Sequence, residues 1–479
     1  MISRYFFLVL LLLFSMATYA IPGCYREDSQ SDNINRQTNE LSDKYQLGSI
    51  PTFYINTNES QDITSKENYI EASYWIVDTI GGYNVGSIQS PKRLNIKGRG
   101  NATWSGFEKK PYRIKLEEKT SLLGMKKDKH FVLLTGVDDL FMGFMKYPVA
   151  YELSRRIGLG WIPEVRYVEL VLNGDYRGLY YLIEKIRVDK NRVAITEQED
   201  GEEDFDKVSG GWLLEIDNYD DEQQLQFEEG NGKVLRITYH SPDSLSDIQR
   251  QYLKNYISEC DKAIYTVDKT NNDWENYIDI ESLAKYYIIN EVLHNAESFM
   301  GSCYMYKERG VNEKLHFGPI WDLGSLLYYG DLNNYFYINP RFDDIHWITE
   351  IVKYPHFQEV VKKIWSSFKN DLNLDEFEDE ILTRIQTAVQ NNYTRWPVEG
   401  WDRDSQQKDR EKFDHYRETK IGFLNDVWAS ETDISSVTAN YCNINRNDFY
   451  SLSGIKIYDT RRIKGVYLSN GKKFIGKNN

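Results

Sequence analysis

The stretch VRYVELVLNGDYRGLYYLIEKI, residues 165–186, gives the clearest local prediction in the chain. Two runs rich in β-branched and aromatic residues flank the sequence Asn173-Gly174-Asp175. An Asn-Gly pair between two such runs predicts a β-hairpin, because the favoured two-residue turn needs positive φ at both central positions. We therefore expect an antiparallel pair of strands in the first half of the chain.

Further strands are expected upstream of this hairpin. Apolar and polar residues alternate in IPTFYINT (50–57), YIEASYWIVD (69–78) and KRLNIKGRG (92–100). A period of two is typical of a strand with one buried face. The first half of the chain is therefore predicted to be rich in strands.

Two nearby segments lack this strand period. In residues 139–159, Val149, Leu153 and Ile157 recur at four-residue steps, which predicts a helix ended by a following glycine. The acidic run EQEDGEEDFD (197–206) has no apolar period and predicts a solvated loop.

The second half is richer in helix. Residues 246–296 and 346–430 carry apolar residues at three- and four-residue steps. Strand patterns occur in GGWLLEIDN (210–218), SCYMYKERG (302–310) and KLHFGPIWDLG (314–324). Strands followed mainly by helices predict an α+β fold with two unlike lobes. A small β-rich tail follows the last helical segment.

Composition limits the classes of function. The chain has 479 residues, which predicts one large body with smaller attachments. Its formal net charge is -15, whereas a nucleic-acid-binding protein needs a basic face. Nucleic acid is therefore not expected as a partner.

The first 20 residues, MISRYFFLVLLLLFSMATYA, predict a secretory signal. Arg4 precedes a short apolar run that ends in small residues at 18–20. The run is too short to predict a transmembrane span. Alternatively, IPGC ending at Cys24 resembles a lipoprotein box, which would make Cys24 a lipid anchor. Both interpretations place the protein in the periplasm, on the cell surface or outside the cell.

The four cysteines lie far apart, with no CxxC pair, at positions 24, 260, 303 and 442. This spacing predicts neither a zinc site nor a dense disulfide framework. One bridge or free buried thiols both remain open from the sequence.

The run NIKGRGNATWSGFEKKPYRIKL, residues 95–116, is the first candidate for chemistry. Gly98 and Gly100 let the backbone approach a ligand, and their amides can meet phosphate oxygens. Arg113 and Lys115 would share one face of a strand. The alternative is an ordinary strand turn with a basic edge, formed by Lys109, Lys110, Arg113 and Lys115.

Polar groups at two further breaks are candidates. Asn295, Glu297 and Ser302 lie between an apolar helix and an apolar strand, a common place for a cleft. Asp322 follows a strand and precedes Gly324, so its carboxylate could reach magnesium, or it could form an Asx turn. The isolated His294 is interpreted as structural.

A helix acid, Glu152, is another candidate. It could pair with a lysine on the neighbouring sheet and fix the position of that lysine. Arg155 and Arg156 stand three and four residues later, so local surface pairs are the alternative.

Taken in order, these motifs resemble those of the CotH kinase family, the spore coat protein H-like proteins. The resemblance runs from IKGRGNATW through KKPYRIKL, VAYELSRRIGL and GGWLLEID to FGPIWDLG, about residues 50–340 and at most to 430. It implies an atypical protein-kinase-like fold and ATP-dependent phosphorylation of secreted or coat proteins. The leader and the tail resemble those of exported Bacteroidota proteins.

Together with the resemblance, the residue patterns predict a domain division, with a signal at 1–20 and a flexible leader at 21–47. The kinase-like domain would cover 48–430, with a β-rich N-lobe at about 48–190 and a helical C-lobe at about 191–430. A small β tail would occupy 433–479.

The resemblance assigns the nucleotide-binding roles as follows. Gly98–Asn101 would cover the phosphates, and Lys115, or else Lys110, would neutralise them. Glu152 would pair with that lysine, and Glu184 would lead into the hinge that meets adenine. ATP with Mg²⁺, or Mn²⁺, is the implied nucleotide and metal.

The catalytic residues implied are Glu297, Asp322 and Lys115, and the metal ligands implied are Asp322 and Ser302. Asp322 would hold the metal, Glu297 would orient the acceptor hydroxyl, and Ser302 would take the second metal position. Protein kinases use Asp and Asn in place of Glu297 and Ser302. Many family members have a second aspartate at the place of Gly324.

These departures leave two alternatives to an enzyme that phosphorylates an exported or surface protein. One is a pseudokinase that binds nucleotide without transfer. The other is a surface adhesion or glycan-binding protein, suggested by the 36 tyrosines and 11 tryptophans, although most of these are expected in the core.

Overall fold

The structure is a computed structural model in which the chain forms a mixed α+β fold. It describes residues 41, 44–136, 144–219, 223–324, 326–327, 331–338, 344–399, 402 and 404–429, and the backbone of four strands nearer the C-terminus. Contacts within the chain divide it into two compact units. The barrel unit comprises Met1–Val137, Arg166–Ile183 and Ile381–Arg403, and the helical unit comprises Asp138–Val165, Glu184–Glu380 and Asp404–Asn479.

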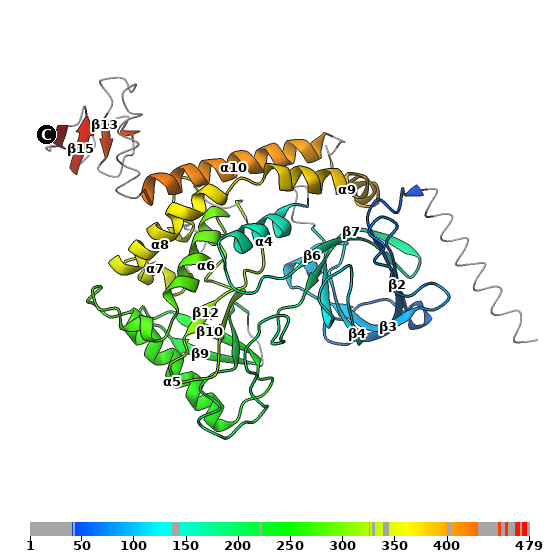
Figure 1. Cartoon of the computed structure of the whole chain (residues 1–479), viewed down its shortest axis with the longest axis horizontal. Helices are drawn as coiled ribbons and strands as arrows, with labels where there is room; N and C mark the ends of the chain where they lie inside the picture. The colour runs from blue at the N-terminus through cyan, green and yellow to red at the C-terminus, as the bar shows by residue number, and fades with distance from the viewer. Residues whose placement is uncertain are drawn as a thin grey trace, which may run out of the picture. The chain divides into compact units, whose positions relative to one another are not determined.

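A closed seven-stranded β-barrel forms the barrel unit (Figure 1). The strands follow one another around the barrel in the order β1-β2-β3-β4-β5-β7-β6, and β1 closes it by pairing in parallel with β6. Their bounds are β1 Thr52–Thr57, β2 Ile70–Val77, β3 Lys92–Gly98, β4 Tyr112–Thr120, β5 Asp128–Leu134, β6 Val165–Leu172 and β7 Asp175–Glu184. The unit also holds a 3₁₀ turn, η1 Asn58–Ser60, and a short helix, α3 Ala102–Gly106.

Alternation along the strands explains the core of the barrel. In β4, Tyr112, Ile114 and Leu116 are buried, whereas Arg113 is half-buried and Lys115 is exposed. Buried side chains from each of the seven strands join one apolar cluster. The interior is therefore packed with side chains, as in other small barrels. The outer face is polar along β3 and β4, whereas along β6 and β7 it is mostly buried.

The predicted hairpin is confirmed as β6 and β7. Asn173 and Gly174 have φ of 51° and 75°, the positive values that the turn requires. The Asn173 side chain also accepts a hydrogen bond from the backbone N of Thr57 at 2.8 Å. Because Thr57 ends β1, the turn residue helps to hold the parallel seam that closes the barrel.

The helical unit contains a five-stranded sheet with the strand order β12-β11-β8-β10-β9. Its strands are β8 Trp212–Ile216, β9 Gln224–Glu228, β10 Val234–Ser241, β11 Cys303–Lys307 and β12 Leu315–Phe317. Its helices are α4 Lys146–Arg156, α5 Asp247–Ile264, α6 Ile280–Val292, α7 Ile348–Ile351, α8 Pro355–Phe368, the first part of α9 Asp375–Arg395, and α10 Ser405–Val427, with 3₁₀ turns η2 Asp273–Asn276, η3 Phe336–Ile338 and η4 Lys369–Asp371.

Helix α6 lies at the centre of this unit. It packs against α4, α8 and α10, and nearly all of its residues from Leu283 onward are buried. The side chain of Asp279 caps its first turn by accepting a hydrogen bond from Ser282 N at 2.7 Å. The predicted helix over 139–159 is confirmed as α4, and the helical predictions for 246–296 and 346–430 are confirmed by α5 to α10.

Loop, strand and tail predictions are also confirmed. Residues 197–206 form no helix or strand and are mostly exposed. The motifs at 210–218, 302–310 and 314–324 contain β8, β11 and β12. In the tail, four strands form a sheet in the order β14-β13-β15-β16, with bounds β13 Phe449–Ser451, β14 Lys456–Ile457, β15 Gly465–Ser469 and β16 Lys472–Gly476.

Several predictions about the ends of the chain lie outside the described residues. They are the signal, the lipid anchor at Cys24 and most of the leader, together with Cys442. Cys260 and Cys303 are described, and both are buried free thiols. No helix in the described part is both long enough and apolar enough to span a membrane.

Candidate functional site

Two loops of the helical unit carry the sequence-predicted catalytic and metal-binding residues. The first, the α6–β11 loop, comprises residues 293–302, and the second, the β12 loop, comprises residues 318–324. Strands β11 and β12 are antiparallel, and Gly318 N donates to the Tyr304 carbonyl at 2.8 Å. The start of β11 therefore adjoins the end of β12. Ser302 and the loop with Asp322 leave the sheet at the same end.

Further contacts tie these loops to each other and to α4. Just beyond the β12 loop, Leu327 N donates to the Leu293 carbonyl at 3.1 Å. The ammonium of the buried Lys146, in the first turn of α4, donates to the Gly324 carbonyl at 2.8 Å. Beside it, Tyr147 meets Trp321 edge-on with ring centroids 6.4 Å apart. Three segments distant in sequence therefore converge.

Backbone strain is concentrated in these loops. Ser302 and Asp322 both have φ of 51°, and His294, Phe299 and Leu327 also have positive φ. Positive φ is uncommon for residues other than glycine, and each instance costs about 1–3 kcal/mol. Such strain persists only where the surroundings fix the backbone, and it is frequent at binding and catalytic sites.

Packing around the α6–β11 loop supplies that constraint. The buried Phe299 ring contacts the rings of Tyr286 and Phe317, and His346 N donates to the Phe299 carbonyl at 2.9 Å. The buried Asn295 is a structural residue, because its side-chain amide donates to Asn290 Oδ1 at 2.9 Å. His294 is buried in the same loop.

The three predicted catalytic and metal-binding residues of this unit differ in exposure. Asp322 is exposed between the buried Trp321 and Leu323, whereas Glu297 and Ser302 are half-buried. No group of three His, Cys, Asp or Glu side chains able to hold a metal occurs in the described part of the chain. Mg²⁺ is commonly bound by one or two carboxylates together with substrate phosphates. The metal-binding roles of Asp322 and Ser302 stay predictions.

Glu152 forms local ion pairs on α4. Its carboxylate lies 2.9 Å from Arg156 Nε and 3.7 Å from an Arg155 guanidinium nitrogen. Arg156 also donates to the backbone carbonyls of Asp371 and Asn373. The surface-pair alternative therefore describes the contacts of Glu152 in this unit, and its pairing with Lys115 stays a prediction.

Glu184 is a buried carboxylate at the point where the chain passes from the barrel unit to the helical unit. It accepts a hydrogen bond from Glu164 N at 3.0 Å and lies 3.6 Å from the buried guanidinium of Arg192. Arg192 in turn donates to the Lys185 carbonyl at 2.9 Å. Glu184 therefore fixes the backbone at this crossing, and its role next to adenine stays a prediction.

In the barrel unit, the fold of the 98–101 loop itself requires both of its glycines. A Cβ on Gly98 would lie 2.5 Å from the indole of Trp104. Gly100 has φ of 78°, and a Cβ there would lie 2.4 Å from Thr103 Oγ1. Asn101 Oδ1 accepts a hydrogen bond from the Lys66 ammonium at 2.9 Å. That this loop covers a phosphate stays a prediction.

The two candidates for the phosphate-binding lysine have different surroundings. Lys110 Nζ donates to the Trp104 carbonyl at 2.6 Å and lies 5.5 Å from the centre of the Trp104 ring. Lys115 is exposed on the outer face of β4. Lys110 therefore already has a hydrogen-bond acceptor and an aromatic partner, and the choice of Lys115 as the phosphate-binding lysine stays a prediction.

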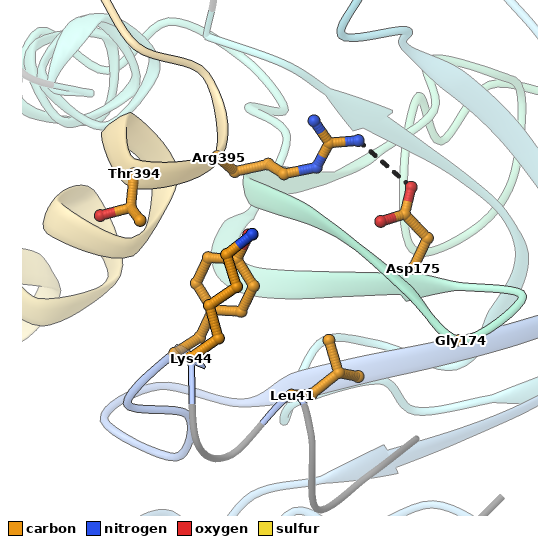
Figure 2. A pocket seen from close by; sticks show the side chains of 7 residues that line it. Leu41, Lys44, Gly174, Asp175, Thr394 and Arg395 are labelled. Atoms are coloured by element: carbon orange, nitrogen blue, oxygen red, sulfur yellow. Dashed lines mark hydrogen bonds and ion pairs between the residues drawn. The ribbon is translucent and has the colours of Figure 1, made fainter. Parts of the chain in front are cut away.

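A cavity of about 350 Å³ occurs elsewhere in the barrel unit, beside the β6–β7 turn (Figure 2). Arg395 and Asp175 form an ion pair across it at 3.2 Å, and Lys44 and Thr394 also line it. None of the sequence-predicted site residues lines this cavity.

The comparison with known families identifies the chain. A family model described as CotH kinase protein matches residues 96–420, more than half of the 479-residue chain. The chain belongs to the CotH kinase family. No curated protein matches it.

The match to the CotH kinase family includes both loops of the helical unit and the 98–101 loop of the barrel unit. Lys146 and Arg192, which contact the segments of Asp322 and Glu184, are among the buried cations that sequence reasoning missed. A lysine in the first turn of a helix opposes the helix dipole, which could have drawn attention to Lys146. No comparable local signal marks Arg192, because nothing in its own segment indicates the contact with Glu184.

Proposed function

We propose that this CotH kinase family protein transfers the γ-phosphoryl group of ATP to a hydroxyl group of a secreted or surface protein. Family membership supports the kinase-like chemistry. The observation that carries the proposal further is the pair of positive φ values at Ser302 and Asp322, at the same end of the β11–β12 pair. These are the two residues for which metal binding was predicted.

The proposal gives each catalytic residue a physical role. Asp322 and Ser302 would hold Mg²⁺, which neutralises charge on the phosphoryl oxygens when bound. Glu297 would orient the acceptor hydroxyl and accept its proton. In the barrel unit, Lys115 would stabilise phosphate charge, and the backbone amides near Gly98 would contact phosphate oxygens.

The proposal includes the architecture and the location. The barrel unit would correspond to the N-lobe of a kinase-like fold, and the helical unit would correspond to the C-lobe. The chain would act in the periplasm, at the cell surface or outside the cell, after removal of residues 1–20 or with a lipid on Cys24. A protein exported by the same route would be its substrate.

The test is transfer of label from γ-³²P-ATP, with Mg²⁺ or Mn²⁺, to the protein itself or to exported proteins from the same cells. Asp322→Ala should reduce incorporation by at least about a hundredfold, because losing a metal ligand removes several kcal/mol of charge stabilisation. Glu359→Ala, at an exposed position on α8, is the control and should keep full activity. Full activity in Asp322→Ala would contradict the proposal.

A pseudokinase is the second candidate. Glu297 and Ser302 favour it, because they replace the Asp and Asn of protein kinases. Gly324 also favours it, because it replaces the second aspartate of many CotH family members. In that case ATP with Mg²⁺ should raise the melting temperature without transfer of label. Robust labelling of a substrate would exclude this candidate.

A further inference from the structure

Three cations share one patch on the outer face of the barrel. In the β3–β4 pair, Lys97 lies directly opposite Arg113, and Asn95 lies opposite Lys115. Residues two apart on a strand point to the same face. Because Ile96 and Ile114 point into the core, Lys97, Arg113 and Lys115 all point outward. We call these three residues the cationic patch.

Facing like charges are unusual in a sheet. Two cations directly opposite each other on neighbouring strands destabilise the pair. Within the described part of the chain, none of the three residues of the cationic patch forms an ion pair with a carboxylate. Four residues before Lys97 on β3, by contrast, Arg93 donates two hydrogen bonds to Glu117 on β4, at 2.8 and 2.5 Å. On the same face, therefore, one cation forms an ion pair with a carboxylate, and the described contacts of the other three include no such pair.

Partial burial of Lys97 and Arg113 adds to the energetic cost of their mutual repulsion. Burial, and next the charge of Arg113, lower the pKa of Lys97, and the nearby charge of Glu67 opposes this shift. The Lys97 ammonium lies 5.0 Å from the centre of the Tyr69 ring and 3.4 Å from the Glu67 carbonyl, which are weak substitutes for a counter-ion. The Nε atom of Arg113 is enclosed and has no hydrogen-bond partner in the structure. Lys97 and Arg113 are therefore partly removed from water without forming an ion pair with a carboxylate.

We propose that Lys97, Arg113 and Lys115 together bind a chain of phosphate groups on the outer face of the barrel. An oligophosphate carries several negative charges in a row, which suits three cations spread over two strands. The planar guanidinium of Arg113 can bind one phosphate with two hydrogen bonds, and the lysines act as point charges beside it. Bound phosphate removes the repulsion between Lys97 and Arg113.

The surroundings of the patch limit where the ligand lies. His130 stands opposite Lys115 on β5, and Glu71 stands opposite Asn95 on β2. A cavity of about 240 Å³ adjoins the patch at Asn95 and is lined by Glu71 and Glu117. These carboxylates repel phosphate, so the chain of phosphates is expected over Lys97, Arg113 and Lys115 and not in the cavity.

If the phosphates are those of ATP, this inference rests on the proposed function. It then adds Lys97 and Arg113 to Lys115 as residues that bind the ATP phosphates. Phosphate binding and phosphoryl transfer are tested separately. Binding of inorganic tripolyphosphate to the full chain is measured by calorimetry with EDTA present, so that no metal at Asp322 contributes. ATP and adenosine are measured in parallel.

Lys97→Ala and Arg113→Ala should each weaken tripolyphosphate binding about tenfold or more, as expected when a charged hydrogen bond is lost. Arg113→Lys should give an intermediate loss. Arg93→Ala, on the same face but paired with Glu117, should bind like the wild type.

Because removing one of two facing cations relieves repulsion, Lys97→Ala should also raise the melting temperature of the unliganded protein. Weaker binding with higher stability cannot come from misfolding.

The outcomes separate the two proposals. Unchanged tripolyphosphate binding in both Lys97→Ala and Arg113→Ala would overturn the cationic patch as a phosphate site. If these variants lose ATP and tripolyphosphate binding together, the patch binds the phosphates of a nucleotide. If they lose tripolyphosphate binding alone, the patch binds phosphates from another source. Tripolyphosphate binding at the patch without any transfer of label would leave this inference standing and count against the proposed kinase activity.

Discussion

Lys109 and Lys115 belong to the same basic run, yet their ammonium groups have different surroundings. Lys109 is 3 % exposed and donates to the carbonyls of Thr135 and Leu179 and to Asn392 Oδ1. Lys115 is exposed on β4. The sequence predicted both as cations of a basic edge. It could not separate them, because Asn392 is 283 residues from Lys109 and no local pattern identifies such a partner.

At the residue scale, the first prediction concerns Gly98. The new methyl group in Gly98→Ala would lie 2.5 Å from the Trp104 ring. We expect a loss of about 1–3 kcal/mol in the free energy of unfolding, the usual cost of overpacking. Urea unfolding measures it.

The control for Gly98→Ala is the same substitution made in a Trp104→Ala variant, which lacks the ring. Adding Gly98→Ala to Trp104→Ala should cost much less than it does in the wild type, so the two changes should be strongly non-additive. An equal cost in both backgrounds would show that the packing against Trp104 is not the reason for glycine at position 98.

At the element scale, prediction succeeded where the signal is local. The β6–β7 hairpin follows from the turn chemistry of Asn173 and Gly174, and α4 follows from its own period. The parallel pairing of β1 with β6 and the strand order of the sheet in the helical unit were not predicted. Pairing between distant strands depends on packing over the whole barrel or sheet, which periodicity within one strand does not contain.

The pairing of α6 with α10 gives the second prediction. Glu291 on α6 and Lys420 on α10 form a fully buried ion pair at 2.7 Å. Burial raises the pKa of Glu291 and lowers that of Lys420, since both charges are removed from water. Lys420→Met should therefore destabilise the protein by about 3–5 kcal/mol, because it leaves a buried carboxylate without its counter-charge.

The double variant Lys420→Met with Glu291→Gln removes both charges. It should recover much of the lost stability, because a neutral pair avoids the cost of an unpaired buried charge. The four free energies from urea unfolding give the coupling between the two residues. If the effects of the two single changes on the free energy of unfolding simply add in the double variant, Glu291 and Lys420 do not stabilise the packing of α6 against α10 as a pair.

At the scale of the whole molecule, the sequence-predicted residues divide between the two units. The 98–101 loop and Lys115 belong to the barrel unit, whereas Glu297, Ser302 and Asp322 belong to the helical unit. The sequence identified the loops of the helical unit because polar residues interrupt apolar elements there. It could not show their positive φ values or the contact from Lys146, since both depend on the packing of three distant segments.

The pH dependence of global stability gives the last prediction, through Asp261 in α5. Burial, with a smaller contribution from the charge of Glu229, raises the pKa of Asp261 from 3.8 to about 6. Hydrogen bonds from Trp347 Nε1 and Gly230 N, at 3.0 Å each, and the nearby His346 oppose this rise. The folded protein therefore binds a proton at Asp261 more tightly than the unfolded chain does.

A raised carboxyl pKa stabilises the folded state below the unfolded pKa, and this contribution is lost as the pH rises through the folded pKa. Between pH 4 and 6, Asp261 should therefore lower the free energy of unfolding as pH increases, by at most about 3 kcal/mol.

Asp261→Asn abolishes this titration and keeps an oxygen for Trp347, but it loses the acceptor for Gly230. The variant should be the less stable protein at pH 4 and should gain on the wild type as the pH rises to 7. Asp243→Asn, at an exposed position, should show no such trend. A difference between Asp261→Asn and wild type that stays constant from pH 4 to pH 7 would mean that Asp261 titrates alike in the folded and unfolded chain, and that its burial beside Trp347 does not govern its charge.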